Sequence, residues 1–367
     1  MNYRMIFYTV GKVLRTECIM LVLPAVISLI YGEYFGAASL LIAAVIALAV
    51  GYSFIFAFKP KSTTFYAKEG LITVSMAWLA VSIIGALPFV ISREIPSYID
   101  ALFETISGFT TTGASILRDV TAMSKGMLFW RSFTHWTGGM GILVFVIALS
   151  QKSPDRSMNI LRAEMPGPIV DKLVPKTRDT AKILYLIYVA LTCVLIVFLL
   201  CGGMSLFDSV THAFATAGTG GFSTKNASIA AFDSVYIEIV IAVFMFLFGI
   251  NFNLFYLVLV GNVGKALKSE EFRTYVVLTV VSTLAIAINI FSLSENFGEA
   301  LRYSFFQVTS IGSSTGFSTA DFDLWPSFSK SVILVLMIIG ACGGSTGGGM
   351  KVSRVMILFK SVAANIK

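Results

Sequence analysis

Long hydrophobic stretches, separated by short polar segments, run along the whole chain. A helix that crosses a bilayer needs about 20 predominantly apolar residues. Eight stretches approach that length: Cys18–Ile30, Ala37–Phe58, Leu71–Ile91, Met127–Ala148, Ile183–Cys201, Ile237–Val260, Tyr275–Phe291 and Val332–Cys342. The first and last are short or polar at one end, so the pattern predicts an all-α polytopic membrane protein with seven or eight spans. So many segments exclude a cleaved signal peptide followed by a soluble domain.

The composition agrees with this fold class, because 56% of the 367 residues are hydrophobic and only 13% are charged. The chain has four cysteines: Cys18, Cys193, Cys201 and Cys342. They lie in or at the ends of apolar segments and form no CxxC pair. We therefore interpret them as small packing residues rather than disulfide partners or metal ligands.

The net charge of +7 is compatible with nucleic-acid binding or with membrane topology. If the N-terminus is cytoplasmic and the spans alternate, 20 of the 27 basic residues fall on the inner side and six on the outer side, with Arg131 inside a helix. Basic residues concentrate in the cytoplasmic loops of membrane proteins. The distribution predicts a cytoplasmic N-terminus. It also explains the positive net charge without a nucleic-acid partner.

The outer side of this topology carries the polar sequence TTTGAS, residues 110–115, directly after YIDALFETISGF, residues 98–109. The preceding stretch is too short and too polar to cross a bilayer, so it predicts a re-entrant half-helix. Irregular backbone at membrane depth is tolerated only where protein or water covers it. We therefore expect this loop to line a cavity.

The same pattern occurs in FDSVTHAFATAGTGGFST, residues 207–224, and in LRYSFFQVTSIGSSTGFST, residues 301–319. Aligned on one glycine, the loops place Gly113, Gly221 and Gly316 at spacings of 108 and 95 residues. The unit is a helix, a half-helix, a glycine loop and a second helix, and its repetition defines the fold. A single such loop is more often only a tight connection. Three in register, on one side of the membrane, favour a functional role.

These residue types suit a cation filter. A dehydrated cation needs oxygen ligands, which backbone carbonyls supply without fixed charge, and glycine permits the dihedral angles that aim consecutive carbonyls one way. The C-terminal ends of the half-helices carry partial negative charge and also favour a cation. The pattern therefore predicts an ion filter.

At these residues the chain resembles the Trk/Ktr/HKT superfamily of potassium transporters, and specifically its bacterial TrkH-type membrane subunits. The resemblance covers nearly the whole chain. It rests on the three filter loops and on FWRSFTHWTGGMGI (Phe129–Ile142), FGINFNLFY (Phe248–Tyr256) and GGSTGGGMKVSR (Gly343–Arg354).

The resemblance implies a potassium-channel-like pore of four helix-P-loop-helix repeats, preceded by two extra helices. The expected divisions are 1–68 for the extra pair, 69–150 and 151–264 for the first and second repeats, and 265–367 for the third. It further implies uptake of potassium, with no other cofactor, across the bacterial inner membrane. The implied partners are a second copy of the chain in a homodimer and a cytoplasmic, nucleotide-binding TrkA-type regulatory subunit.

By the same resemblance, the filter comprises Thr111, Thr112, Gly113, Gly220, Gly221, Thr315 and Gly316. Potassium is expected at the carbonyls of Thr112, Gly113, Gly221 and Gly316. A glycine at the position of Gly113 accompanies potassium selectivity in the superfamily, whereas serine there often accompanies sodium transport.

The segment GGSTGGG interrupts the last apolar stretch; it consists of Gly343, Gly344, Ser345, Thr346, Gly347, Gly348 and Gly349. It is not a phosphate-binding P-loop, because Met350 separates the last glycine from Lys351 and Val352 follows. Seven small residues predict an unwound segment. The resemblance implies an intramembrane loop that gates the pore, and close helix packing through small residues is the alternative.

Charged and polar residues inside the membrane are functional candidates. Arg131 and His135 share a helix face, and we expect Arg131 to pair with a carboxylate such as Glu104 or Asp100 rather than to contact the ion. Glu104, His212 and Gln307 each lie nine residues before a filter glycine. We therefore predict that these three residues, together with Arg131, brace the filter loops. Asp100 and Asp208 lie thirteen residues before theirs and suit half-helix N-termini.

Only three of the four implied repeats are present. We therefore expect either a truncated product or a chain that another chain completes. Either case puts in question whether this chain conducts potassium by itself. Two further alternatives stay open: a sodium-selective or ion-coupled carrier, and a non-conducting assembly partner. No arrangement of residues supports an enzyme.

Overall fold

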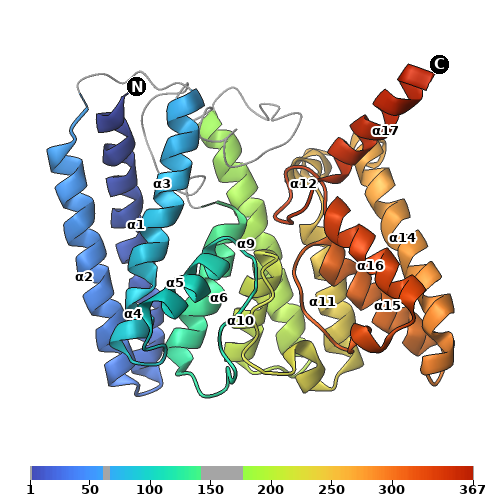
Figure 1. Cartoon of the computed structure of the whole chain (residues 1–367), viewed down its shortest axis with the longest axis horizontal. Helices are drawn as coiled ribbons and strands as arrows, with labels where there is room; N and C mark the ends of the chain where they lie inside the picture. The colour runs from blue at the N-terminus through green and yellow to red at the C-terminus, as the bar shows by residue number, and fades with distance from the viewer. Residues whose placement is uncertain (1, 61–66, 142–176, 367) are drawn as a thin grey trace. The chain divides into compact units, whose positions relative to one another are not determined.

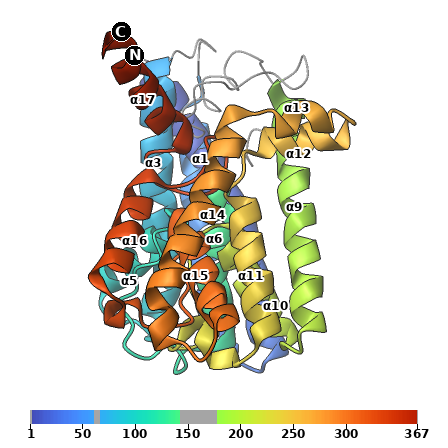
Figure 2. The same cartoon turned by 90° about the vertical axis from the view of Figure 1, so that its right-hand side faces the viewer.

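The structure is a computed structural model that describes residues 2–60, 67–141 and 177–366, and within these ranges the regular secondary structure is entirely helical. The chain forms two compact units that divide within helix α9, between Tyr185 and Leu186. Figure 1 colours the helices along the chain and Figure 2 turns the view by a quarter. The all-α prediction is confirmed for the described residues.

The first unit contains helices α1 to α6 and the first turns of α9. Their bounds are α1 Tyr3–Ile30, α2 Tyr34–Ala57, α3 Ala67–Gly85, α4 Leu87–Ile91, α5 Tyr98–Phe109, α6 Lys125–Gly139 and α9 Thr177–Cys201. The second unit contains the rest of α9 and the helices that follow. These are α10 Leu206–Ala217, α11 Val235–Phe248, α12 Phe252–Leu259, α13 Val263–Leu267, α14 Glu270–Ile290, α15 Phe297–Gly312, α16 Ser327–Ile339 and α17 Val352–Ile366.

Five helical segments among the described residues are long and apolar enough to cross a membrane: 3–30, 34–57, 68–91, 181–201 and 270–293. Helices α11 and α12 add a sixth if they are counted as one span, although they meet at an angle of 92°. The protein is therefore a multi-pass membrane protein, as the hydrophobic pattern predicts. The last seven residues of the predicted span Met127–Ala148, 142–148, lie outside the described residues.

The predicted span Ile237–Val260 is broken in the structure, because the helix ends at Phe248 and a new one begins at Phe252. At Gly249 an added Cβ atom would lie 2.2 Å from the Tyr275 hydroxyl, so α14 packs directly against the backbone there. The side chain of Asn251 accepts a hydrogen bond from the Asn253 N–H at 3.0 Å and begins a new helix. A close backbone contact followed by an N-cap ends one helix and starts another.

Two further boundaries differ from the hydrophobic pattern. Helix α1 begins at Tyr3, well before the predicted Cys18, because its polar first half is also helical. Helix α16 ends at Ile339, where Gly340 has φ of 69° and turns the chain. The last predicted span is therefore a 13-residue apolar helix followed by a loop.

In the first unit, α1, α2 and α3 stand side by side (Figure 1). Helices α1 and α2 approach so closely that a Cβ atom added to Gly11 would lie 2.7 Å from the carbonyl oxygen of Gly51. Small residues allow this contact between membrane helices, where van der Waals packing replaces the hydrophobic effect as the driving force.

Two carboxylates fasten other segments of the first unit to the start of α6. Glu33, which precedes α2, accepts hydrogen bonds from the N–H groups of Lys125 at 2.7 Å and Gly126 at 2.9 Å. Glu94, which follows α4, accepts from the N–H of Ser124 at 3.0 Å and from its hydroxyl at 2.6 Å. Because the first N–H groups of a helix have no partner within it, carboxylates there satisfy them and complement the helix dipole.

In the second unit, α15 packs against α11, α14 and α16, as Figure 2 shows for this part of the chain. Its contact with α14 and α16 is an apolar cluster of Ile286, Ala287, Ile290, Ala300, Val308, Trp325, Ile333 and Leu336. The third half-helix, α15, is therefore held by apolar packing against α14 and α16, and a polar loop follows its C-terminal end.

Burial raises the pKa of the Glu94 carboxyl, hydrogen bonds from Ser124 oppose the shift, and the neighbouring Glu33 carboxylate adds to it. A folded-state pKa above the unfolded value stabilises the fold below the ordinary glutamate pKa, and this contribution disappears as the pH rises through the raised value. Glu94→Gln mimics the neutral acid and keeps both contacts with Ser124. As the pH rises from acidic to neutral, we expect the melting temperature of the variant to fall less than that of the wild type.

The measurement is the melting temperature of the purified protein in detergent across that pH range. Glu295→Gln, at an exposed site that caps no helix with its carboxyl group, is the matched control. Parallel curves for wild type and Glu94→Gln would contradict the role given to burial.

Candidate ion-conduction site

The three predicted half-helices are present and begin in the same way. Helices α5 and α10 have 12 residues and α15 has 16, one turn more. In each, the side chain of the residue before the helix accepts a hydrogen bond from the N–H three residues on: Ser97 from Asp100, Ser205 from Asp208, and Asn296 from Glu299. An acid three residues after the N-cap also complements the helix dipole.

The third acid was missed from sequence because counting back from the glycine assumes equal helix lengths. Glu299 is the equivalent of Asp100 and Asp208, but the extra turn of α15 moves it further from Gly316. The signal that identifies it is the spacing from the capping residue Asn296.

The half-helices also end in the same way. The N–H of the residue before each filter glycine donates to the carbonyl five residues back: Thr112 to Ser107 at 2.9 Å, Gly220 to Ala215 at 2.9 Å, and Thr315 to Ser310 at 2.8 Å. This is the bond that closes a Schellman motif, whose left-handed residue is usually glycine. Here that residue is Thr111, Thr219 or Ser314, with φ of 53°, 54° and 63°.

The filter glycines are left-handed as well. Gly113, Gly221 and Gly316 have φ of 77°, 81° and 84°, and in each loop the residue between the two left-handed positions has negative φ. When positive and negative φ alternate along a loop, successive carbonyls can face one side. Glycine takes the last left-handed position because it has no Cβ to oppose it.

The second and third loops lie against each other within the second unit. A Cβ atom added to Gly221 would come within 2.0 Å of the Thr315 carbonyl oxygen, so only glycine fits there. No heavy atom lies within 4 Å of a Cβ added to Gly316, where backbone conformation alone requires glycine. The first loop belongs to the other unit.

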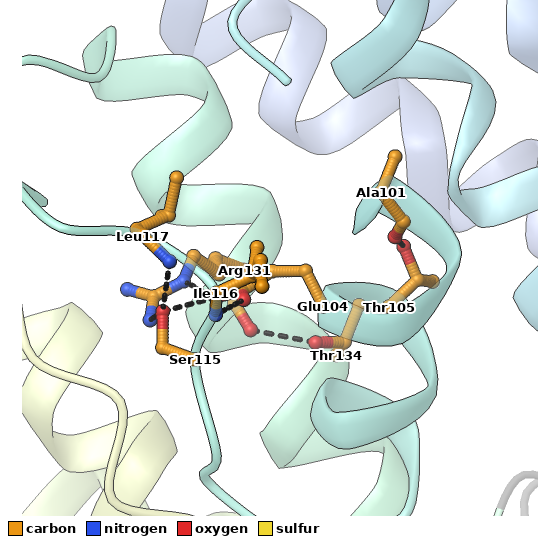
Figure 3. Close-up of polar contacts among 8 residues, drawn as sticks. All are labelled: Ala101, Glu104, Thr105, Ser115, Ile116, Leu117, Arg131 and Thr134. Atoms are coloured by element: carbon orange, nitrogen blue, oxygen red, sulfur yellow. Dashed lines mark hydrogen bonds and ion pairs between the residues drawn. The ribbon is translucent and has the colours of Figure 1, made fainter. Parts of the chain in front are cut away.

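The first loop is held from behind by an ion pair between Glu104 on α5 and Arg131 on α6 (Figure 3). Both side chains are buried, with 1% and 3% of their surfaces exposed. Glu104 also accepts hydrogen bonds from the Ser115 hydroxyl at 3.0 Å and the Ile116 N–H at 2.9 Å, and Arg131 donates to Ser115 at 3.1 Å. The expected pairing of Arg131 is therefore with Glu104, and it reaches the residues just after Gly113.

His212 occupies the matching place behind the second loop and is fully buried. Its Nδ1 lies 2.8 Å from the Asp208 carbonyl oxygen and its Nε2 lies 2.9 Å from the Ser223 hydroxyl, two residues after Gly221. The Asp208 carboxylate accepts from the Thr224 hydroxyl at 2.7 Å. Asp208 thus joins the start of the half-helix to the end of the loop. The sequence predicted only that Asp208 complements the helix dipole, and not this contact.

The third loop is closed by a different side chain. Gln307 is buried, with 2% of its surface exposed. The Ser310 hydroxyl donates to the carbonyl of Phe317 at 2.6 Å and spans the filter glycine. Ser310 was missed from sequence, since one serine within a helix rich in hydroxyls carries no distinguishing signal.

The segment from Gly340 to Lys351 is non-helical, as the run of small residues predicts. Gly340, Gly344, Gly349 and Lys351 are all left-handed. The chain folds back on itself, because the Met350 N–H donates to the Ile338 carbonyl at 3.0 Å and the Val352 N–H to the Ala341 carbonyl at 3.1 Å. We call residues 340–351 the glycine loop.

The glycine loop is bonded to both neighbouring filter loops. The Gly348 N–H donates to the Ser314 hydroxyl at 2.6 Å, and the Thr219 hydroxyl donates to the Thr346 carbonyl at 2.9 Å. Ser314 and Thr219 are the left-handed residues that end the third and second half-helices. The Lys351 ammonium group is buried and donates to the Gly347 carbonyl within the loop.

The other side of the glycine loop is bonded to α14 and α12. Glu271, in the first turn of α14, accepts from the Gly343 N–H at 2.7 Å and from the Ser353 N–H of α17 at 3.3 Å. The Phe252 N–H of α12 donates to the Gly344 carbonyl at 3.0 Å, so the break between α11 and α12 accommodates this loop.

The chain matches the TrkH family, described as cation transport proteins, over residues 37–367. The chain belongs to this family. The Trk system potassium uptake protein TrkH of Salmonella typhimurium is 36% identical over 372 residues, which cover all of this chain and 77% of that protein. TrkG of Escherichia coli K12, also a Trk system potassium uptake protein, is 32% identical, covering 98% of this chain and 75% of TrkG.

The crystal structure of the potassium transporter TrkH from Vibrio parahaemolyticus superposes with a TM-score of 0.89 at 31% identity. The similarity covers all of this chain and 76% of that one. The chain therefore spans about three quarters of the length of these TrkH-family relatives. Membership in a family of transport proteins agrees with the absence of an enzyme motif noted from sequence.

The ion pair behind the first loop can be tested by a double-mutant cycle. Breaking a buried pair by removing one partner costs about 3–5 kcal/mol, because the other charge is left uncompensated. We expect Glu104→Gln and Arg131→Met each to destabilise the protein by this order and the double variant to be less destabilised than the sum.

The measurement is thermal unfolding of the purified variants in one detergent. Strictly additive losses would show that the two side chains act independently, against the contact seen in Figure 3. The conservative pair Glu270→Gln and Lys360→Met, at an exposed ion pair, is the control and should change stability little.

Proposed function

We propose that this protein takes up potassium through a filter of backbone carbonyls in the three loops that contain Gly113, Gly221 and Gly316. The observation that carries this proposal is the alternation of backbone hand that all three loops share, ending at Gly113, Gly221 and Gly316. It agrees with the potassium uptake named for the Trk relatives. Carbonyl oxygens replace the hydration shell of potassium without adding fixed charge.

In this mechanism potassium sheds water at the carbonyls of Thr112, Gly113, Gly221 and Gly316, flanked by Thr111, Gly220 and Thr315. The half-helices end at these loops, and the partial negative charge of their C-termini favours a cation. Inward movement gains about 2.3 kcal/mol per charge for each 100 mV of membrane potential.

The braces keep the carbonyls in place when the ion leaves. Glu104 with Arg131 holds the first loop, His212 the second, and Ser310 the third, with Gln307 buried in the same half-helix. A loop without such support could turn its carbonyls to other partners, because parallel dipoles repel one another. In this proposal Glu104, Arg131, His212 and Gln307 brace the filter.

The glycine loop acts as the gate in this proposal. Gly343, Gly344, Ser345, Thr346, Gly347, Gly348 and Gly349 are joined to the filter through Ser314 and Thr219, and to the first turn of α14 through Glu271. Backbone of this kind has no competing regular structure to hold it, so breaking a few bonds would let it move aside.

The wider assembly follows the resemblance. We propose a bacterial inner-membrane location with the N-terminus in the cytoplasm, a homodimer, and a TrkA-type nucleotide-binding subunit on the cytoplasmic basic loops. Residues 1–68 would form an added helix pair, and 69–150, 151–264 and 265–367 the successive repeats.

The filter proposal predicts a large loss of potassium uptake in Gly221→Ala. The added methyl group would overlap the Thr315 carbonyl oxygen and would also meet a left-handed backbone. Gly264→Ala is the matched control, because no heavy atom lies within 4 Å of its added Cβ atom and its φ is not left-handed. Uptake is measured in a bacterial strain without its own potassium systems, with sodium compared in parallel.

Growth at low potassium should require the wild-type glycine at 221 and tolerate alanine at 264. Equal uptake by both variants, at equal amounts in the membrane, would reject the filter. A protein that carries sodium as well as potassium would instead reject the proposed selectivity.

The gate proposal predicts faster potassium flux in Glu271→Ala, because the Gly343 N–H loses its acceptor and the closed loop is destabilised. Loss of a buried hydrogen-bond partner costs about 1–3 kcal/mol, which corresponds to roughly a 5- to 150-fold change in an open-to-closed equilibrium. Glu270→Ala, one residue away, removes only the exposed pair with Lys360 and should leave flux unchanged. Flux is measured in proteoliposomes, and equal or lower flux in Glu271→Ala would contradict the gate.

A further inference from the structure

An acidic residue, Glu17, lies near the middle of α1. The side chain of Glu17 is completely buried, with 0% of its surface exposed. Among the described residues, neither carboxyl oxygen has a hydrogen-bond partner. An ionisable group inside a membrane segment is costly and marks a function more often than a structural role.

Within the part of the chain that the structure describes, the helices packed against α1 bring no charge to compensate Glu17. They are α2, α3 and α6. Helix α2 contains no charged residue, and α3 contains only Lys68 and Glu69 in its first turn. The Glu69 carboxylate lies 3.4 Å from the Asn2 backbone nitrogen, which places it at the start of α1, about 22 Å along the helix from Glu17 at 1.5 Å per residue.

Two of the charged side chains of α6 have other partners, and the third lies near the far end of α1. Arg131 is paired with Glu104 and bonded to Ser115. His135 bonds to the backbone of Ser107 on α5. Lys125 lies at the start of α6, where its N–H is bonded to Glu33 beyond the end of α1.

On α1 itself, Arg15 is exposed and the Lys12 ammonium group lies over the Tyr8 ring at 4.6 Å. The neighbouring thiol of Cys18 carries no positive charge. Within the described residues, therefore, no cation is positioned to neutralise an ionised Glu17.

The ligand that fits this site is a proton. The residues one turn away on the same buried face are Val13, Leu14, Met20 and Leu21, which offer no side-chain oxygen. A metal cation needs several oxygen ligands, whereas a proton needs one carboxyl oxygen. Burying an isolated carboxylate costs far more free energy than protonating it.

We infer that Glu17 is a proton-binding site of the N-terminal helix pair and first repeat, where the carboxyl group is neutral at physiological pH. The site is separate from the proposed filter and does not depend on it. Release of the proton would leave an uncompensated charge between α1 and its neighbours, so release requires water to enter or the helices to move apart.

The test compares infrared spectra of wild type and Glu17→Gln, both reconstituted in lipid vesicles. The wild type minus variant difference should contain the carbonyl stretch of a protonated carboxylic acid at neutral pH, and this band should persist into mildly alkaline buffer. Carboxylate stretches in its place would overturn the proposal. Glu104→Gln is the matched control, because an ion-paired glutamate should give the carboxylate bands.

Thermal stability gives an independent readout. Glutamine is nearly isosteric with a neutral carboxylic acid, so Glu17→Gln should melt at the wild-type temperature or above. A fall as large as that of Glu104→Gln would mean that Glu17 is ionised and partnered, and would also overturn the proposal. Neither measurement depends on potassium transport, so a failure here is distinct from a failure of the filter proposal.

Discussion

A row of backbone carbonyls that faces an ion path must be held in place by bonds from behind. Parallel carbonyl dipoles repel one another, and an apolar surrounding offers no water to relieve them. In the proposed filter the alternation of positive and negative φ sets the direction of the carbonyls, and the capped half-helices fix where each loop begins. The other features of the site stabilise that arrangement.

The three loops have the same backbone but different supports. The first uses a buried ion pair, the second a histidine between a carbonyl and a hydroxyl, and the third a serine that reaches across the glycine. Each satisfies polar groups that would otherwise be buried without partners, which is the larger part of what a hydrogen bond contributes. Similar backbone geometry therefore does not require similar side chains.

The glycine loop is part of the same polar network. Its contacts with Ser314 and Thr219 involve the two residues that take the strained left-handed conformation at the ends of their half-helices. A movement of the glycine loop would remove a bond from each of these residues. In the proposed function, opening the gate therefore also changes the support of two filter loops. The glycine loop is bonded to Glu271 on one side and to the hydroxyls of Ser314 and Thr219 on the other.

Much of this arrangement is predictable from sequence because it depends on local chemistry. The apolar stretches, the half-helices and the threefold glycine pattern concern residues close together in the chain, where spacing and side-chain type are sufficient. The half-helix of residues 98–109 has the predicted bounds, and the interruption after Ile339 follows from the run of small residues.

Tertiary structure decided the partners. Sequence offered two carboxylates for Arg131, and the packing of α5 against α6 selects Glu104. The sharp bend at Gly249 depends on Tyr275 of another helix, and the absence of compensating charge around Glu17 depends on which helices pack against α1. Hydrophobicity and local propensity determine which segments are helices, but contacts between residues far apart in the chain determine which polar group meets which. Those contacts exist only once the helices are packed.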